Sequence, residues 1–299
     1  MKTKTFSNAQ VLALLRARGK ALTASGSFST GRNYLSTASS FHDFLSGVPS
    51  LDAQRFGPVT LRLYGNWLLE VRGVSRNTRT FYFRNLRAAW HAAGGDPAVF
   101  APALVRSETT RKRALSPGAL VELRALPLQG RQALWRDLFL FSFMARGMAF
   151  VDMAYLRKRD IADGYIRYTR RKTGQALSVR VEPGMGEILD KWRSDDGSPF
   201  VFPVVRSVGQ KGYRQYASGL GSYNRTLHAL GLELGCAGLT GYAARHSWAT
   251  SARRAGVPVA VISEGMGHCS ERTTRIYLAS FEETLLDEAN RRVLKHVGL

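Results

Sequence analysis

The chain has 299 residues, and its 43 Lys and Arg against 22 Asp and Glu give a formal net charge of +21. Its length is typical of two domains of about 150 residues each, and a hydrophobic content of 44% excludes a disordered tail. A folded protein this basic is suited to bind a polyanion, with nucleic acid the first candidate, although a merely soluble basic protein would have the same charge.

Several classes of protein are excluded by features that the sequence lacks. Two cysteines, Cys236 and Cys269, are too few for a disulfide framework and fit a reducing cytoplasm, and no close metal-ligand spacing is present. The first residues contain no long apolar run, so we expect no signal peptide. Charged side chains interrupt the apolar stretch 133–156, which favours a buried helix over a membrane span. Without a phosphate-binding lysine loop, we expect no nucleotide and no other cofactor.

The first hundred residues are predicted to be helical throughout. We expect helices at 29–45, 60–71 and 77–93, the last of which ends at a Gly-Gly-Asp-Pro sequence. Four arginines around the third segment lie within an arc of about 140° on a helical wheel. A solvated face has the same pattern, but a stripe without matching acidic residues favours contacts with DNA phosphates. The stripe consists of Arg76, Arg79, Arg84 and Arg87.

A polar and highly charged stretch at 105–113 marks a boundary in the chain. Directly after it, Ser116 before Pro117 predicts the N-cap and the first position of a new helix. We therefore expect a helical domain at 1–106, a linker at 107–116 and a second domain at 117–299.

The second domain is predicted to contain the chain's only clear β signal. Helices are expected from 117 to about 156, and a β-hairpin of 165–170 and 176–181 follows, with Gly174 in its turn. Helical patterns resume at about residue 216. The expected fold class is mainly α with a small antiparallel β-sheet.

The most informative residues lie between 240 and 277. They are Arg245-His246, an Ala-Gly-Val turn at 255–257, Gly267-His268, and Tyr277 nine residues after that histidine. In this order and spacing they resemble the C-terminal signature of tyrosine site-specific recombinases, the phage integrase and Xer family. The sequence is most similar to the forms found in mobile elements of Bacteroides-type bacteria.

The resemblance covers most of the chain. Residues 109–116 resemble the family's interdomain linker, 144–156 its first arginine motif, 171–174 its β-hairpin lysine, and 77–87 the last helix of its core-binding domain. It implies an all-helical SAM-like core-binding domain that holds one face of double-stranded DNA, and a tyrosine-recombinase catalytic domain that closes on the other.

The resemblance also implies a reaction. Tyr277 would attack a phosphodiester, form a 3′-phosphotyrosyl enzyme and release a 5′-hydroxyl, with no metal ion. Arg146 and Arg245 would stabilise the transition state, because guanidinium groups stay charged and bind two oxygens. Lys172 would protonate the leaving 5′-oxygen, and His268 would contact the phosphate or seat the tyrosine.

Two positions depart from the family pattern. Ala149 stands where most members have the first arginine, and we expect Arg146, three residues earlier on the same helical face, to reach the phosphate instead. Tyr242 stands where the family usually has a histidine. A phenol donates a hydrogen bond but is no base at neutral pH, so we expect it to contact the phosphate. His246 is expected to be structural.

The C-terminal segment completes the expectations. Ser280 and Glu283 form a capping box after Tyr277, and the following helix would pack on its own domain or, as the resemblance implies, on a neighbouring protomer. A dimer on each DNA site and a homotetramer on two sites would then carry out integration, excision or inversion in the cytoplasm.

Three other interpretations remain open. A DNA-binding regulator could keep the fold without cleaving strands, which the two departures at Ala149 and Tyr242 make conceivable. A metal-dependent nuclease could use His268 with acidic partners, although no ligand cluster is visible in the sequence. A topoisomerase that relaxes DNA could use the same tyrosine chemistry.

Overall fold

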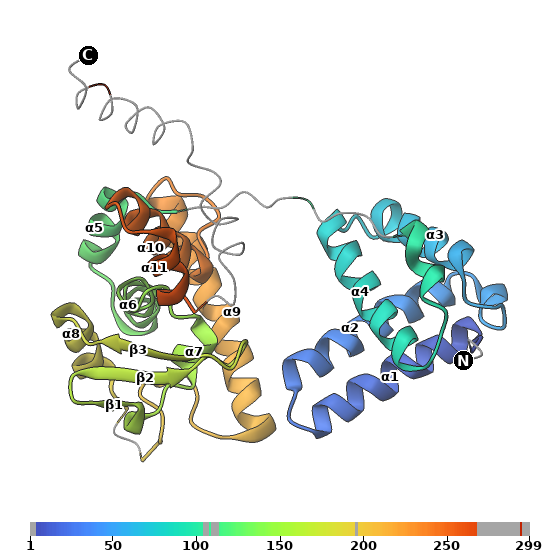
Figure 1. Ribbon diagram of the computed structural model, residues 1–299, viewed down its shortest axis with the longest axis horizontal. Helices are drawn as coiled ribbons and strands as arrows, with labels where there is room; N and C mark the ends of the chain where they lie inside the picture. The colour runs from blue at the N-terminus through green and yellow to red at the C-terminus, as the bar shows by residue number, and fades with distance from the viewer. Residues whose placement is uncertain (1–3, 104–107, 109–113, 195–196, 268–293, 295–299) are drawn as a thin grey trace. The chain divides into compact units, whose positions relative to one another are not determined.

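A computed structural model of the chain describes residues 4–103, 108, 114–194, 197–267 and 294. The chain divides into two compact units, Met1–Thr110 and Arg111–Leu299, whose elements are labelled in Figure 1. Within the described ranges the chain is mostly helical, with one three-stranded antiparallel sheet. The predicted fold class is confirmed.

Among its described residues, the first unit contains four α-helices. They are α1 (Asn8–Ala24), α2 (Phe28–Ser46), α3 (Pro58–Asn66) and α4 (Arg76–Ala92), with 3₁₀ turns at Pro49–Leu51 and Pro97–Ala103. The predicted helices 29–45 and 77–93 are confirmed to within one residue, whereas 60–71 divides into α3 and a π-helical turn, Trp67–Val71. Helix α1 was not delimited from the sequence, although Ser7 and Gln10 form its capping box. The core is rich in aromatic residues, including Phe41, Tyr64 and Trp90.

The second unit contains the sheet and seven helices among its described residues. The helices are α5 (Pro117–Ala125), α6 (Gly130–Met144), α7 (Phe150–Ala154), α8 (Pro183–Trp192), α9 (Gly209–Glu233), α10 (Gly241–Arg254) and α11 (Val259–Gly265). Figure 1 shows α6 in the middle of this unit, where it packs against α5, α8, α9 and α10. Ser116 caps α5 and Pro117 is its first residue, as predicted.

The predicted hairpin is present with its register set by a short turn. Strand β2 (Tyr165–Thr169) pairs with β3 (Ala176–Arg180) so that Ile166 lies opposite Val179, and β1 (Ile161–Ala162) extends the sheet on the other side of β2. The turn needs a left-handed residue, which Gly174 supplies at φ 72°.

The prediction of a single buried helix at 133–156 was wrong. Helix α6 ends at Met144, and α7 begins only at Phe150. The chain reverses between them at Arg146 (φ 56°) and Gly147 (φ 76°), and this conformation cannot continue a right-handed helix. Helix α8 was not predicted, and α9 begins seven residues before the predicted position. None of the helices in the described ranges combines the length and apolar character needed to cross a membrane.

A buried carboxylate ties α6 to α8. Asp137 accepts hydrogen bonds from Arg136 Nε (2.8 Å), Lys191 Nζ (2.8 Å) and Trp192 Nε1 (2.7 Å). Burial raises the pKa of Asp137, but these hydrogen bonds outweigh burial, so that the pKa lies below its ordinary value. A carboxyl whose pKa is lowered by folding stabilises the protein above its unfolded pKa and loses this effect as the pH falls.

We expect Asp137→Asn to lower the free energy of unfolding by about 3 kcal/mol at pH 7, because it leaves buried donors without a charged acceptor. The difference from wild type should narrow as the pH falls below about 4. Urea denaturation followed by tryptophan fluorescence at pH 7 and in acid measures both. Asp163→Asn, at an exposed carboxylate paired with Arg167, is the control and should change little. A loss that is the same at every pH would contradict the electrostatic explanation.

Candidate active site

Arg245 on α10 connects three segments that are distant in the chain. Its side chain is buried, with Nη1 donating to the carbonyl of Gly147 (2.9 Å) and Nη2 to that of Met266 (2.6 Å). A Cβ atom at Gly147 would lie 2.7 Å from Arg245 Cα, so only glycine fits there. The turn before α7, the start of α10 and the end of α11 therefore converge on one guanidinium.

A second buried guanidinium comes from the end of β2. Arg170 is 7% exposed, and its Nη1 donates to the carbonyl of Gly267. Its Nε atom is buried and has no hydrogen-bond partner among the described residues. A Cβ atom at Gly267 would lie 2.8 Å from Arg170 Cδ, so the two segments are in close contact. Arg170 is thus held at the same end of α11 as Arg245.

The two guanidinium groups repel each other electrostatically. Burial, followed by the positive charge of Arg170, lowers the pKa of Arg245 to about 10, while Tyr242, Tyr168 and Asp152 partly oppose this. Arg245 therefore remains charged at neutral pH. Two cations at close range with one nearby buried carboxylate form a site that favours a bound anion such as a phosphodiester.

The buried carboxylate is Asp152 on α7. Its Oδ1 accepts the backbone N–H of Arg171 (2.9 Å). Burial raises its pKa, against the lowering effects of that hydrogen bond and of the charges on Arg170, Arg171 and Arg245. Asp152 therefore attaches the start of the hairpin turn to α7.

Lys172 lies in the exposed part of that turn. The turn is closed by two backbone hydrogen bonds of 2.8 Å, from Gly174 N–H to Arg170 O and from Arg170 N–H to Gln175 O. The Arg170 side chain is buried near Arg245, whereas the Lys172 side chain is exposed to solvent. Of the three consecutive basic residues, Lys172 is thus placed to meet a substrate from outside.

Tyr242 lies in the first turn of α10, one turn before Arg245. It is 49% exposed, and its ring packs edge-on against buried His246, with the centroids 5.0 Å apart. Burial raises the pKa of the Tyr242 phenol, and the charges of Arg245 and Arg170 oppose this. The phenol therefore keeps its proton at neutral pH and can donate a hydrogen bond.

Arg146 lies near the same region, but in a turn and not on the predicted helix. It is in the turn before α7, so it does not share a helical face with Ala149, which precedes α7 as its N-cap. A Cβ atom at Gly265 would lie 3.5 Å from Arg146 Cδ. Burial raises the pKa of Tyr168, and the charge of Arg146 is one of those that oppose this rise. Arg146 therefore extends toward α11 and the sheet.

Sequence reasoning missed the position of Arg170. It treated Arg170 only as a neighbour that made the lysine assignment uncertain. The available signal was the alternation along β2, where Ile166 is buried and Tyr168 partly buried, so that the next residue on that face is Arg170. No arginine occupies position 149, and Arg170 instead brings a guanidinium to the site from the sheet.

The other predicted site residues are either outside the described residues or in the first unit. His268 and Tyr277, like Ser280 and Glu283, are outside the described residues. Within the α4 stripe, Arg84 and Arg87 are exposed, and Arg76 pairs with Glu108 (3.3 Å). The Arg79 guanidinium lies 5.1 Å from the Phe83 ring centroid and packs against Gly65. Within the ranges that the structure describes, no three His, Cys, Asp or Glu residues are grouped so that they could hold a metal ion.

Comparison with known proteins matches residues 121–284 to the model of the phage integrase family. Among curated proteins, none matches the chain. The fold is similar to that of a lambda integrase dimer bound to a COC′ core site, with 16% identity and a TM-score of 0.67 over 94% of this chain and 97% of that one.

Two further structures share the fold. The Tn1549 transposon integrase in complex with transposon right-end DNA is 15% identical, with a TM-score of 0.62 over 98% of this chain and 100% of that one. The XerH site-specific recombinase bound to a difH substrate is 18% identical, with a TM-score of 0.58 over 88% of this chain and 79% of that one.

Proposed function

Because the chain belongs to the phage integrase family, we propose that it is a tyrosine-type site-specific recombinase that cuts and rejoins DNA strands for integration, excision or inversion. The observation that carries the proposal is the buried pair of Arg245 and Arg170 beside the solvent-facing Lys172. We further propose that the protein belongs with the forms found in Bacteroides-type mobile elements, in keeping with Ala149.

The reaction we propose is a transesterification. The phenolic oxygen of Tyr277 forms a bond to the scissile phosphorus, and the bond from phosphorus to the 5′-oxygen breaks. The transition state carries close to two negative charges, which Arg245, Arg170 and Arg146 stabilise as fixed cations. The leaving 5′-oxygen takes a proton from Lys172. The phosphotyrosyl ester keeps the bond energy, so reversal with a second 5′-hydroxyl rejoins the strands.

The remaining site residues would hold the phosphate in place. Tyr242, protonated and half exposed, donates a hydrogen bond to a phosphate oxygen, and His268 supplies another or seats the nucleophile. The proton of Tyr277 passes to solvent water as its oxygen bonds to phosphorus, while Lys172 supplies the proton that the 5′-oxygen takes up.

The first unit would supply DNA affinity. We propose that residues 1–106 hold DNA from one side, that 107–116 form the linker and that 117–299 carry the chemistry. Arg76, Arg84 and Arg87 are the exposed members of the α4 stripe and would contact phosphates, which position the protein without reading sequence. Arg79, which is only partly exposed and packs against the Phe83 ring, would contribute less.

A dimer on each DNA site and a tetramer on two sites form part of the proposal. Lambda integrase, which shares the fold, has been solved as a dimer bound to a core site and as a tetramer bound to a Holliday junction. The apolar stripe of Leu285, Leu286, Ala289 and Val293 would join neighbouring protomers.

The experiment that tests the proposal is covalent capture. The full-length protein is incubated with a random-sequence duplex library, and DNA that stays attached after denaturation is sequenced. A nicked version of the selected duplex then serves as a suicide substrate. We expect a protein attached to a DNA 3′-phosphate and a free 5′-hydroxyl, formed equally with and without EDTA.

The alternative candidate is a DNA-binding regulator without cleavage, which Ala149 and Tyr242 favour. It predicts binding to DNA with no covalent product from the wild-type protein. Loss of cleavage in EDTA would instead indicate the metal-dependent nuclease, and capture without sequence preference would indicate a topoisomerase.

A further inference from the structure

The hairpin turn is attached to the body of the second unit by Arg171 as well as Arg170. The guanidinium carbon of Arg171 lies 4.2 Å from the centroid of the Tyr155 ring, a close cation–π contact. The backbone N–H of the same arginine is bound by Asp152. Tyr155 and Asp152 are three residues apart at the end of α7. The same short helix therefore contacts both the side chain and the backbone N–H of Arg171.

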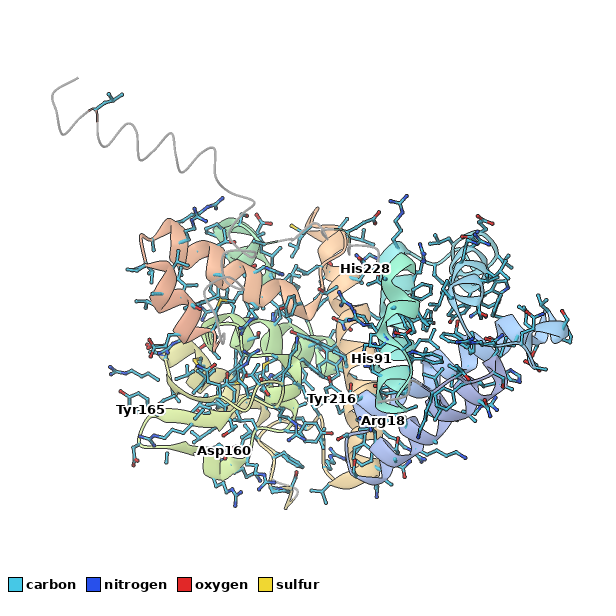
Figure 2. The ribbon with its side chains drawn as sticks, turned by 45° about the vertical axis from the view of Figure 1, so that its right-hand side comes forward. Arg18, His91, Asp160, Tyr165, Tyr216 and His228 are labelled. Carbon is cyan, nitrogen blue, oxygen red and sulfur yellow. The ribbon has the colours of Figure 1, made fainter. Side chains whose placement is uncertain are left out.

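The Tyr155 ring is itself held by two neighbours. Tyr216 on α9, labelled in Figure 2, lies 5.8 Å away between ring centroids, and Phe200 packs edge-on at 5.7 Å. Burial raises the pKa of the Tyr155 phenol, with the Arg171 charge in opposition, so the ring stays neutral at physiological pH. The ring that Arg171 contacts is therefore held in place by residues outside the hairpin.

This arrangement determines how the turn is oriented. The hydrogen bonds between Arg170, Gly174 and Gln175 close the turn but do not tie it to other elements. Three contacts do so: the Arg170 side chain against Gly267, the Arg171 side chain over Tyr155, and the hydrogen bond from the Arg171 backbone N–H to Asp152. Lys172 directly follows Arg171, so its direction depends on these contacts, of which the Tyr155 ring fixes the Arg171 side chain.

We propose that Tyr155 is a positioning residue for Lys172. The proposal rests on the function proposed above, in which Lys172 protonates the leaving 5′-oxygen. By holding Arg171, the Tyr155 ring keeps the lysine within hydrogen-bond reach of that oxygen, and proton transfer requires this reach. Tyr155 does not touch the substrate and acts through the turn.

The test compares two leaving groups on the DNA selected by covalent capture. One substrate has the natural 5′-oxygen at the scissile phosphate, and the other has a bridging sulfur. A thiol has a pKa of about 8.5 and leaves without being protonated, whereas an alkoxide needs the acid. A variant that has lost only the acid is therefore slow on the oxygen substrate and rescued on the sulfur substrate.

We expect Tyr155→Leu to slow covalent adduct formation on the oxygen substrate about tenfold, the effect of one partly buried cation–π contact, and to match wild type on the sulfur substrate. Tyr155→Phe keeps the ring face and should behave as wild type on both. Lys172→Ala should show a larger loss, about 10²-fold or more, with the same rescue.

Arg171→Gln removes the same cation–π contact from the arginine side. Arg171 is exposed, so this variant should fold even if Tyr155→Leu does not, and it should be rescued by sulfur in the same way. Because both changes remove one contact, the double variant Tyr155→Leu, Arg171→Gln should be no slower than the slower single variant.

Several outcomes would overturn the proposal. Equal slowing of Tyr155→Leu and Arg171→Gln on both substrates would show that the contact serves folding or DNA binding and not proton transfer. Rescue of Lys172→Ala without rescue of Tyr155→Leu and Arg171→Gln would leave Lys172 as the acid and remove Tyr155 from its positioning. If Lys172→Ala is not rescued, there is no acid for Tyr155 to place. Absence of any wild-type adduct would refute the proposed function itself.

Discussion

Tyr277→Phe is expected to abolish the covalent adduct between protein and DNA while leaving DNA binding intact. Phenylalanine keeps the ring but has no oxygen to form the phosphodiester bond. The loss should be complete, because a phenolic nucleophile has no substitute in a site of cations. Denaturing gels measure the adduct, and gel-shift titration of the same duplex measures binding.

Tyr242→Phe is the matched control for this variant. Tyr242 lies beside the buried arginines and has a half-exposed phenol, so it is the tyrosine that would form the adduct if Tyr277 were misassigned. We expect its adduct to form more slowly, since one hydrogen-bond donor is lost, but to persist. An adduct that survives in Tyr277→Phe and disappears in Tyr242→Phe would reverse the assignment.

Arg170→Ala is expected to lower the rate of adduct formation about 10²- to 10³-fold, the usual cost of removing one preorganised donor to a charged transition state. The reason is that Arg170 and Arg245 are the two buried cations among the described residues of the site, and the family's first arginine position holds Ala149. Single-turnover rates at saturating DNA measure the effect apart from binding. Arg170→Lys should recover only part of the rate, because an ammonium cannot form the two-pronged guanidinium contact.

Arg167→Ala is the control for Arg170→Ala. Arg167 comes from the same strand, but its side chain is exposed and pairs with Asp163 (3.5 Å). Its removal should change the rate less than about twofold, as is typical of an exposed ion pair. Wild-type cleavage by Arg170→Ala would mean that the buried guanidinium only supports the fold. Urea denaturation of both variants separates slow chemistry from loss of structure.

Much of the fold was predictable from the sequence because helix ends and tight turns depend on residues close together in the chain. Ser75 and Ser116 cap α4 and α5 through their own side chains, and a glycine at φ 72° closes the β2–β3 hairpin. The candidate catalytic motif was likewise visible from its spacing, and a match of residues 121–284 to the phage integrase family supports it. Each of these signals lies within a few residues or in a fixed motif.

The break after α6 and the inward course of Arg170 were decided only by tertiary structure. The turn at Gly147 exists because Arg245, 98 residues away, packs against its backbone. Arg170 binds a carbonyl 97 residues away, and this contact makes it part of the site instead of one more basic residue in a hairpin. Local sequence determines backbone preference and exposure, whereas the meeting of two buried guanidinium groups depends on how helices and sheet pack, and no short stretch of sequence contains that information.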